Sequence, residues 1–379
     1  MGIQLISMGD TKNRFLVCCV FFDLYTTKKE VSMKKMVRVF ALAAAASALF
    51  VGCKKKDGSS AQAPAAAAKP LNLIIAHNQT SLENPYAYGI NAFKEKIEQI
   101  SGGQITVTCH HGTLGENENE LVEKLQMGAA SIVIASPGFM ASVGVPEVDV
   151  FSLEYLFRSF DHWKSCLDGQ FGKELADIIN KKSGNNFRIL GYWSAAVRDY
   201  YGKKPIHSPD DLKGMTIRIQ SAAVQQQFWK ACGAIPTSVA WGELYQALQQ
   251  GVVDSAENDY TNFMLKEHHK TKNGHYICET EHDFTTRLML IEGSFYDKLT
   301  DQQKAWVDQA AKYATQVERQ KTFEQASSSK AKVIADGAEI VDHKDIDIDA
   351  FMALAIPVQD EFAKKNGMEK YIQMVRDTK

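Results

Sequence analysis

The sequence predicts an α/β fold in which largely parallel strands alternate with helices. Strand and helix patterns alternate between residues 71 and 136, and a second alternating run extends from 187 to 258. A helical pattern that begins after Thr300 continues toward Gly337. At about 1.5 Å per residue, such a helix is longer than one small domain needs. The 379-residue chain is long enough for two domains, which this helix could connect.

The first run has the order strand, helix, strand, helix, strand. The helix at 86–100 carries Ile90, Phe93 and Ile97 at helical spacing. The expected segments are strands at 71–77, 104–109 and 131–136 and helices at 86–100 and 116–128. In parallel sheets, ligands bind beyond the carboxyl ends of the strands. His77, Asn78 and the loop around Glu116 fall at those ends.

The second run is predicted from shorter segments. Its expected strands are 187–193, 215–219, 234–239, 252–258 and 287–293, and its expected helices are 222–232 and 242–251. Residues 194–209 are interpreted as a long polar connection. The long helix that follows is predicted to start at a capping box. In this motif Thr300 caps the N-terminus of the helix, and the Gln303 side chain bonds back to the backbone N–H of Thr300.

The amino-terminal region has the features of an export signal. A basic start at 33–38 precedes an apolar run that ends at Gly52-Cys53, where a bacterial lipoprotein signal would end. We expect a lipoprotein signal peptide at 33–53, with a lipid on Cys53 that attaches the protein to a membrane, and the open alternative is an ordinary cleaved signal. Residues 54–70 are predicted to be a flexible tether. Residues 1–32 are interpreted as an upstream extension from a misassigned start.

Four cysteines remain in the folded region, and none forms a C-x-x-C pair. This spacing disfavours a zinc site, whereas export would permit a disulfide. Four separate buried thiols is the preferred interpretation. The cysteines are Cys109, Cys166, Cys232 and Cys278.

The sequence contains none of the enzyme motifs that we sought. It has no G-x-S-x-G, H-E-x-x-H, P-loop or G-x-G-x-x-G. The paired histidines at 110–111 and 268–269 would point to opposite faces of a strand, which disfavours chelation. The net charge of −2 and the absence of a basic stripe disfavour nucleic-acid binding. We therefore expect a binding protein without catalytic residues, metal or cofactor.

Two arginines suggest what is bound. Arg218 lies within the apolar strand MTIRI, and Arg198 follows the strand FRILGYW. A buried guanidinium is costly unless an acid pairs with it, and its planar fork matches a carboxylate. The acid could belong to the chain, as an internal salt bridge, or to a ligand.

Several segments, taken together in order, resemble the solute-binding proteins of tripartite ATP-independent periplasmic (TRAP) transporters. They are HGTLGENENELVEKLQMGAASIVIAS, VPEVDVFSLEYLF, KKPIHSPDDLKGMTIRI and GELYQALQQGVVDSAEN. The resemblance extends over essentially all of residues 71–379. Glu154 and Ser255 depart from it, because the family often has Pro and Gly at those places.

The resemblance implies a two-lobed periplasmic-binding-protein-like fold with crossing hinge strands and a long lobe-spanning helix. It implies lobe I at 71–195 and 284–325, and lobe II at 196–283 and 326–379. In the family, the arginine of the IR strand pairs with the ligand carboxylate, which corresponds to Arg218. The second arginine corresponds to Arg198, and the asparagine of the EN turn corresponds to Asn258.

Further candidates lie in the loops expected at the cleft. His77, Asn78, Glu83, Glu116 and Glu118 could contact ligand hydroxyls, although the glutamates could equally be exposed or favour a helix N-terminus. Aromatic residues could form walls of the cleft or belong to the core. These are Trp193, Trp241 and Tyr260.

The resemblance also suggests the ligand and the partners. The segment AENDYTNF and the polar stretch after it look like the branch that binds sugar acids such as uronates and aldonates. Four-carbon dicarboxylates, keto acids and sialic acid remain open. We expect an extracytoplasmic protein that delivers its ligand to a TRAP membrane permease. The alternatives are a binding protein that feeds a sensory receptor, a binding protein of an ATP-driven importer, and an exported enzyme.

Overall fold

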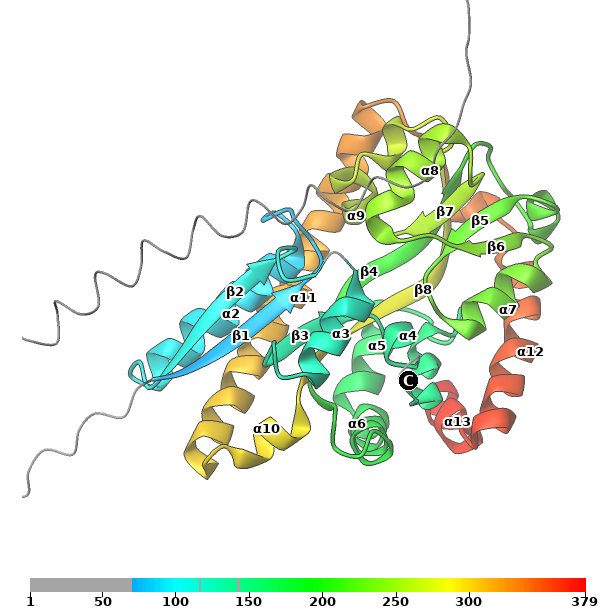
Figure 1. The fold of residues 1–379 in the computed structure, drawn as a ribbon. Helices are drawn as coiled ribbons and strands as arrows, with labels where there is room; N and C mark the ends of the chain where they lie inside the picture. Colours follow the sequence, from blue (N-terminus) through cyan, green and yellow to red (C-terminus); the bar gives the residue numbers. More distant parts are fainter. Residues whose placement is uncertain (1–69, 116, 142–143) are drawn as a thin grey trace, which may run out of the picture. The chain divides into compact units, whose positions relative to one another are not determined.

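One mixed nine-stranded sheet forms the centre of the region that the structure describes (Figure 1). The structure is a computed structural model that describes residues 70–115, 117–141 and 144–379. In sheet order the strands are β2 (Ile105–His111), β1 (Leu71–His77), β3 (Ile132–Ala135), β8 (Tyr276–Ile291), β4 (Arg188–Gly202), β7 (Ser255–Asn258), β5 (Thr216–Ile219) and β6 (Ile235–Ser238), and β9 (Glu339–Val341) pairs with β8.

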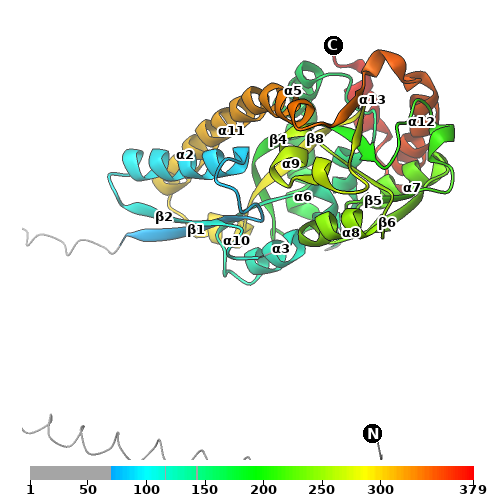
Figure 2. The same cartoon turned by 90° about the horizontal axis from the view of Figure 1, so that it is seen from above.

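Helices cover both faces of this sheet. They are α2 (Pro85–Ile100), α3 (Glu118–Gln126), α4 (Pro137–Ala141), α5 (Phe160–Asp168), α6 (Gln170–Lys182), α7 (Ala223–Ala231), α8 (Leu244–Gln250), α9 (Tyr260–Leu265), α10 (Gly293–Lys298), α11 (Asp301–Ala335), α12 (Ile348–Asn366) and α13 (Glu369–Asp377). In Figure 2, α2 lies on one side of β1 and β2 with α11 next to it, whereas α3 lies on the other side.

The sheet has a parallel part at each end, and long strands connect the two parts. β1 pairs in parallel with β2 and β3, and β5 pairs in parallel with β6 and β7. Between them, β4 and β8 run antiparallel to each other over most of their length. The predicted parallel runs are therefore confirmed, and β4 and β8 are the crossing strands of a two-lobed α/β fold.

Each lobe has its own hydrophobic core. In the first lobe, one cluster packs α2, α10 and α11 against the sheet, and another packs α3 to α6 against its opposite face. In the second lobe, α7 and α12 pack on one cluster, whereas α8 and α9 pack on another. The first-lobe cluster also includes Ala222 and Val224 at the start of α7, so the lobes contact each other outside the crossing strands as well.

The long helix α11 belongs to both lobes. It has 35 residues, so it extends about 52 Å, and it starts at the predicted capping box of Thr300 and Gln303. Val307 and Ala314 pack in the first-lobe core, whereas Val333 packs in the second. The prediction of a lobe-spanning helix is confirmed.

Two long strands differ from the expectation. The expected polar connection 194–209 is strand as far as Gly202, and β8 begins at Tyr276 rather than at 287. The β4–β8 register shifts at irregularities, one of which includes Ala196 with a φ of 55°. Such bulges interrupt the alternation of apolar and polar residues, so the pattern of a buried strand is hidden in the sequence.

The carboxyl-terminal helices also differ from the expectation, which placed 326–379 in the second lobe. Phe351 and Ala355 at the start of α12 do pack in a second-lobe core. Phe362, Ile372 and Val375, however, pack in a first-lobe core. An apolar stripe shows that a helix is buried, but it does not tell which of two cores receives it.

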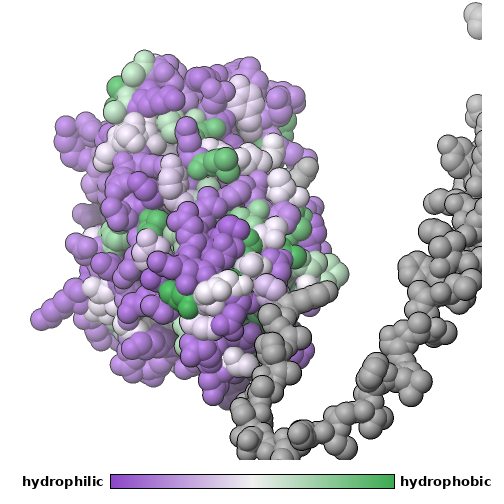
Figure 3. Space-filling model, turned by 90° about the vertical axis from the view of Figure 1, so that its left-hand side faces the viewer, coloured by the Kyte–Doolittle hydropathy of each residue, from purple (hydrophilic) through white to green (hydrophobic). Residues whose placement is uncertain are grey.

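The four cysteines of the described region are free; Cys166, Cys232 and Cys278 are buried as predicted, whereas Cys109 is only half-buried. No helix within residues 70–115, 117–141 and 144–379 is long and apolar enough to cross a membrane. The face shown in Figure 3 is mostly hydrophilic, with hydrophobic residues only in small scattered groups. The predictions for 1–32, 33–53, 54–69 and the lipid on Cys53 lie outside the described residues.

Glu318 of α11 links the long helix to the crossing strand β4. Its carboxylate is fully buried and accepts hydrogen bonds from the Ser194 backbone N–H at 3.1 Å and from the Thr322 hydroxyl at 3.1 Å. Burial raises the pKa of Glu318 to about 8, although these hydrogen bonds act in the opposite direction. The carboxyl is therefore favoured in its neutral form when the protein is folded.

We expect a pH-dependent contribution of Glu318 to stability. Between about pH 4.5 and pH 8, the unfolded chain releases the Glu318 proton while the folded protein retains it, so the free energy of unfolding decreases as pH rises. Urea unfolding at pH 5 and pH 8 should therefore show the wild type losing stability relative to Glu318→Gln. Glu361→Gln, which removes an exposed carboxylate from α12, is the matched control. A difference between wild type and Glu318→Gln that stays constant over this range would contradict the prediction.

Candidate functional site

A cavity of about 430 Å³ lies between the two lobes, at the predicted carboxyl ends of the strands. The first lobe contributes residues that follow β1 and residues at the start of α3, whereas the second contributes residues at the ends of β5, β6 and β7. The lining consists of Asn78, Gln79, Asn117, Glu118, Asn119, Glu120, Glu123, Phe139, Arg218, Gln220, Ser221, Ser238, Val239, Ala240, Trp241, Asn258, Asn262 and Arg287.

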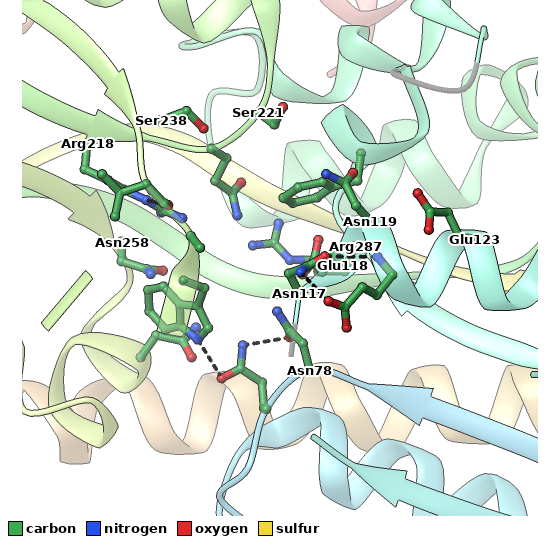
Figure 4. A pocket seen from close by; sticks show the side chains of 18 residues that line it. Asn78, Asn117, Glu118, Asn119, Glu123, Arg218, Ser221, Ser238, Asn258 and Arg287 are labelled. Carbon is green, nitrogen blue, oxygen red and sulfur yellow. Dashed lines mark hydrogen bonds between the residues drawn. The ribbon is translucent and has the colours of Figure 1, made fainter. Parts of the chain in front are cut away.

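Charges of both signs line this cavity. In Figure 4, Arg218 and Asn258 approach from one side, the start of α3 with Glu118 and Glu123 from the other, and Arg287 lies between them. Amide side chains fill much of the remaining wall. Such a cavity offers donors for an anion and acceptors for hydroxyl groups within one ligand's length.

Arg218 is placed as the sequence predicts. It lies on β5, is 3% exposed, and its Nε donates to the Val239 carbonyl at 3.0 Å. Its Nη1 is buried without a hydrogen-bond partner, and no carboxylate of the described chain lies within ion-pair distance of it. Burial lowers the pKa of Arg218, although Glu257 acts in the opposite direction. A cation that is desolvated but unpaired is an arrangement that an anionic ligand would complete.

Arg198 differs from its predicted role. It is completely buried and does not line the cavity, and its Nε forms an ion pair with Glu257. Its Nη2 donates to the Glu257 carbonyl at 2.7 Å. Burial raises the pKa of Glu257, but attraction and hydrogen bonding by Arg198 and His282 together outweigh this effect and lower the pKa to about 2. The predicted contact with ligand is corrected here: β7 brings Glu257 beside β4, so the internal salt bridge neutralises this guanidinium.

Arg198 nevertheless acts on the cavity through Asn258. Its Nη1 donates to Asn258 Oδ1 at 3.0 Å, and the Asp259 N–H donates to the same oxygen at 3.0 Å. Both partners are donors only, so the amide oxygen of Asn258 must face them and the amide nitrogen remains for the cavity. Asn258 therefore lines the cavity as a donor, and Arg198 is a positioning residue.

Asn78 and Trp241 are also placed at the cavity as predicted, and one hydrogen-bonded chain connects them (Figure 4). Trp241 Nε1 donates to Gln79 Oε1 at 3.3 Å, and Gln79 Nε2 donates to Asn78 Oδ1 at 3.1 Å. Because Trp241 belongs to the second lobe and Gln79 to the first, this chain of bonds crosses between lobes. The ring of Trp241 also lies 5.7 Å from the Arg218 guanidinium.

Of the predicted glutamates, Glu118 lines the cavity. It is the first residue of α3, is 4% exposed, and its Oε2 accepts a hydrogen bond from the Ser136 N–H at 2.6 Å. Asn117, not Glu118, caps the helix. Glu83 is exposed and does not line the cavity. Glu116 lies outside the described residues.

Three other predicted residues lie away from the cavity. His77 is buried, hydrogen-bonds His111 at 3.0 Å, and has its pKa lowered to about 3 by burial, so it is neutral. Trp193 packs in the first-lobe core and donates to Thr315 Oγ1 at 3.1 Å. The Tyr260 hydroxyl donates to Glu279 at 2.9 Å. For the two aromatic residues, core packing is the better interpretation.

The sequence reasoning missed Arg287, together with several amides such as Gln79 and Asn262. A signal for Arg287 was present, since it opens the apolar segment RLMLIEG just as Arg218 interrupts MTIRI. No such signal exists for the amides, because an isolated Asn or Gln in a loop is common.

The chain is similar to known proteins in sequence and in fold. The family model described as "Bacterial extracellular solute-binding protein, family 7" matches residues 75–366. Among solved structures, a TRAP periplasmic solute-binding protein from Sulfitobacter sp. NAS-14.1 with bound β-D-galacturonate has 27% sequence identity and a TM-score of 0.75, covering 81% of this chain and 99% of that one.

Two further solved structures are similar to about the same degree. A TRAP periplasmic solute-binding protein from Pseudomonas putida F1 with bound D-glucuronate is 28% identical, with a TM-score of 0.75, and covers 81% of this chain and 97% of that one. Its counterpart from Sulfurospirillum deleyianum with bound succinate is 29% identical, with a TM-score of 0.74, and covers 82% and 100%. The similarity therefore includes proteins with sugar acids and one with a dicarboxylate.

Proposed function

The chain belongs to the bacterial extracellular solute-binding proteins of family 7, and on that premise we propose that it binds a sugar acid, such as a uronate or aldonate, between its lobes. TRAP solute-binding proteins are periplasmic, so the ligand would be captured outside the cytoplasm. The observation that carries the proposal is the buried Arg218 guanidinium, which faces the cavity without an ion pair within the described chain.

The ligand class follows from the opposite wall of the cavity. Arg218 and the Asn258 amide would hold one carboxylate, because both present N–H donors. Glu118 and Glu123 on the α3 side present acceptors, which suit hydroxyl groups and repel a second carboxylate. A monoanion with several hydroxyls fits this distribution better than a dicarboxylate. The uronates bound in two similar structures support the same class.

The proposed mechanism is capture followed by closure. Because the ligand contacts come from both lobes, the ligand favours a closed arrangement by the contacts that only that arrangement completes. The β4 and β8 strands would act as the hinge, and α11 would accommodate the motion. The closed protein would then deliver the acid to a TRAP membrane permease. A lipid anchor at Cys53 stays a prediction, which the mass of the mature amino terminus would test.

A thermal-shift panel tests the ligand class. We expect D-galacturonate, D-glucuronate or D-gluconate to raise the unfolding temperature, because a ligand at about 100 times its Kd stabilises the folded state by about 2.7 kcal/mol. D-Galactose, which lacks the carboxylate, is the matched control and should give no shift. A larger shift with succinate, pyruvate or sialic acid would contradict the sugar-acid class. No shift with any acid would contradict the function itself.

A further inference from the structure

Arg287 is a second guanidinium in the cavity, and neither the fold nor the proposed contacts of Arg218 account for it. It lies on β8, one of the two crossing strands, opposite Trp193 of β4. It is 4% exposed and lines the cavity. The site therefore contains two buried cations that come from different strands.

The contacts of Arg287 leave its hydrogen-bonding capacity largely unused. Its Nη1 donates to the Thr286 carbonyl at 3.0 Å, and its Nε is buried without a partner. No carboxylate of the described chain lies within 4.0 Å of its guanidinium nitrogens, unlike Arg198 and Arg319, which pair with Glu257 and Asp168. An arginine with a structural role alone would be expected to pair in the same way.

Three acidic side chains lie near enough to Arg287 to feel its charge without forming an ion pair with it. Attraction by Arg287 acts to lower the pKa of Asp259, of Asp283 and of Glu318, although burial raises each of the three. Asp259, Asp283 and Glu318 all lie beyond ion-pair distance of Arg287, so none of them occupies its N–H groups. The remaining donors of Arg287 are therefore available toward the cavity.

The place of Arg287 indicates which part of a ligand it would meet. In Figure 4 it lies between Arg218 and the start of α3, and hence near the middle of the cavity. A ligand whose carboxylate is held by Arg218 and whose far hydroxyls face Glu118 would present its ring or central hydroxyl oxygens there. A guanidinium has donors only, so it selects oxygen acceptors.

We propose that Arg287 is a second ligand-contacting guanidinium, which donates hydrogen bonds to oxygens of the ligand beyond the carboxylate bound by Arg218. This inference rests on the proposed function of the site. Its position on a crossing strand makes the contact independent of the lobe that carries Arg218. Recognition would then require both an acid group and oxygen atoms along the body of the ligand.

Calorimetric titration of the purified protein tests the proposal. The ligand is D-galacturonate, or whichever acid of the thermal-shift panel the wild type binds most tightly. Arg287→Met keeps most of the side-chain length and removes the donors, and we expect it to weaken binding about tenfold to a hundredfold. Arg287→Lys retains the charge without the planar fork, so its affinity for the acid should lie between those of the wild type and Arg287→Met. Arg376→Met, which removes an exposed arginine of α13, is the matched control and should bind as the wild type does.

The outcomes separate this proposal from the proposed function. If Arg287→Met and Arg287→Lys unfold near the wild-type temperature without ligand and bind within about twofold of it, the role of Arg287 is refuted while the function stands. If Arg287→Met does not fold, the affinity of Arg287→Lys decides. If the wild type binds no acid of the panel, the proposed function fails, and the role of Arg287 fails with it.

Discussion

Replacing Arg218 by methionine is expected to weaken binding of the acid ligand by about a hundredfold or more. The guanidinium is desolvated by its surroundings, and its Nη1 lacks a partner within the described chain, so the ligand carboxylate would be its main compensating charge. Removing one partner of a buried, hydrogen-bonded charge pair costs about 2–5 kcal/mol in binding. Calorimetric titration with the acid selected by the thermal-shift panel measures this loss.

The same substitution should not destabilise the protein without ligand. Arg218→Met breaks no ion pair in the described structure and removes the cost of burying a cation, so the unfolding temperature should stay the same or rise. Arg218→Lys retains a charge but not the bidentate geometry, and it should recover only part of the affinity. Near-native affinity in a folded Arg218→Met variant would refute the role of Arg218 as the carboxylate anchor.

Unlike Arg218→Met, which should leave stability unchanged or higher, Arg198→Met is expected to lower the free energy of unfolding strongly. The substitution leaves Glu257 buried without its counter-charge and removes the donor that orients the Asn258 amide. Breaking a buried pair from one side costs about 3–5 kcal/mol of folding free energy. Urea unfolding at neutral pH, compared with the wild type, gives this value directly.

A double variant provides the control for Arg198. Replacing Glu257 by glutamine in the same chain removes the stranded charge, so Arg198→Met/Glu257→Gln should be more stable than Arg198→Met alone. An Arg198→Met variant that is as stable as the wild type but cannot bind the acid would contradict the structural role of Arg198. It would favour the direct ligand contact that the family resemblance implied.

The features that the sequence predicted correctly depend on patterns that are local in the chain. The strand–helix alternation, the Thr300 cap and the start of α11 are encoded by neighbouring residues, because helix and strand periodicities repeat within a few positions. Arg218 was predictable for the same reason, since a cation within an apolar strand is conspicuous beside its immediate neighbours. The irregular strands β4 and β8 were not, because bulges and buried polar residues break their alternation.

The sequence alone thus determined the α/β class, the long helix, the family resemblance and the position of Arg218 within an apolar strand. Only the tertiary structure decided which arginines face the cavity. Arg198 is neutralised by Glu257, which lies 59 positions away in the chain and is brought alongside by the β4–β7 pairing, whereas Arg287 has no carboxylate of the described chain within ion-pair distance. The partner of a buried charge depends on which strands lie side by side in the folded protein, and the spacing of residues along the sequence does not give that pairing.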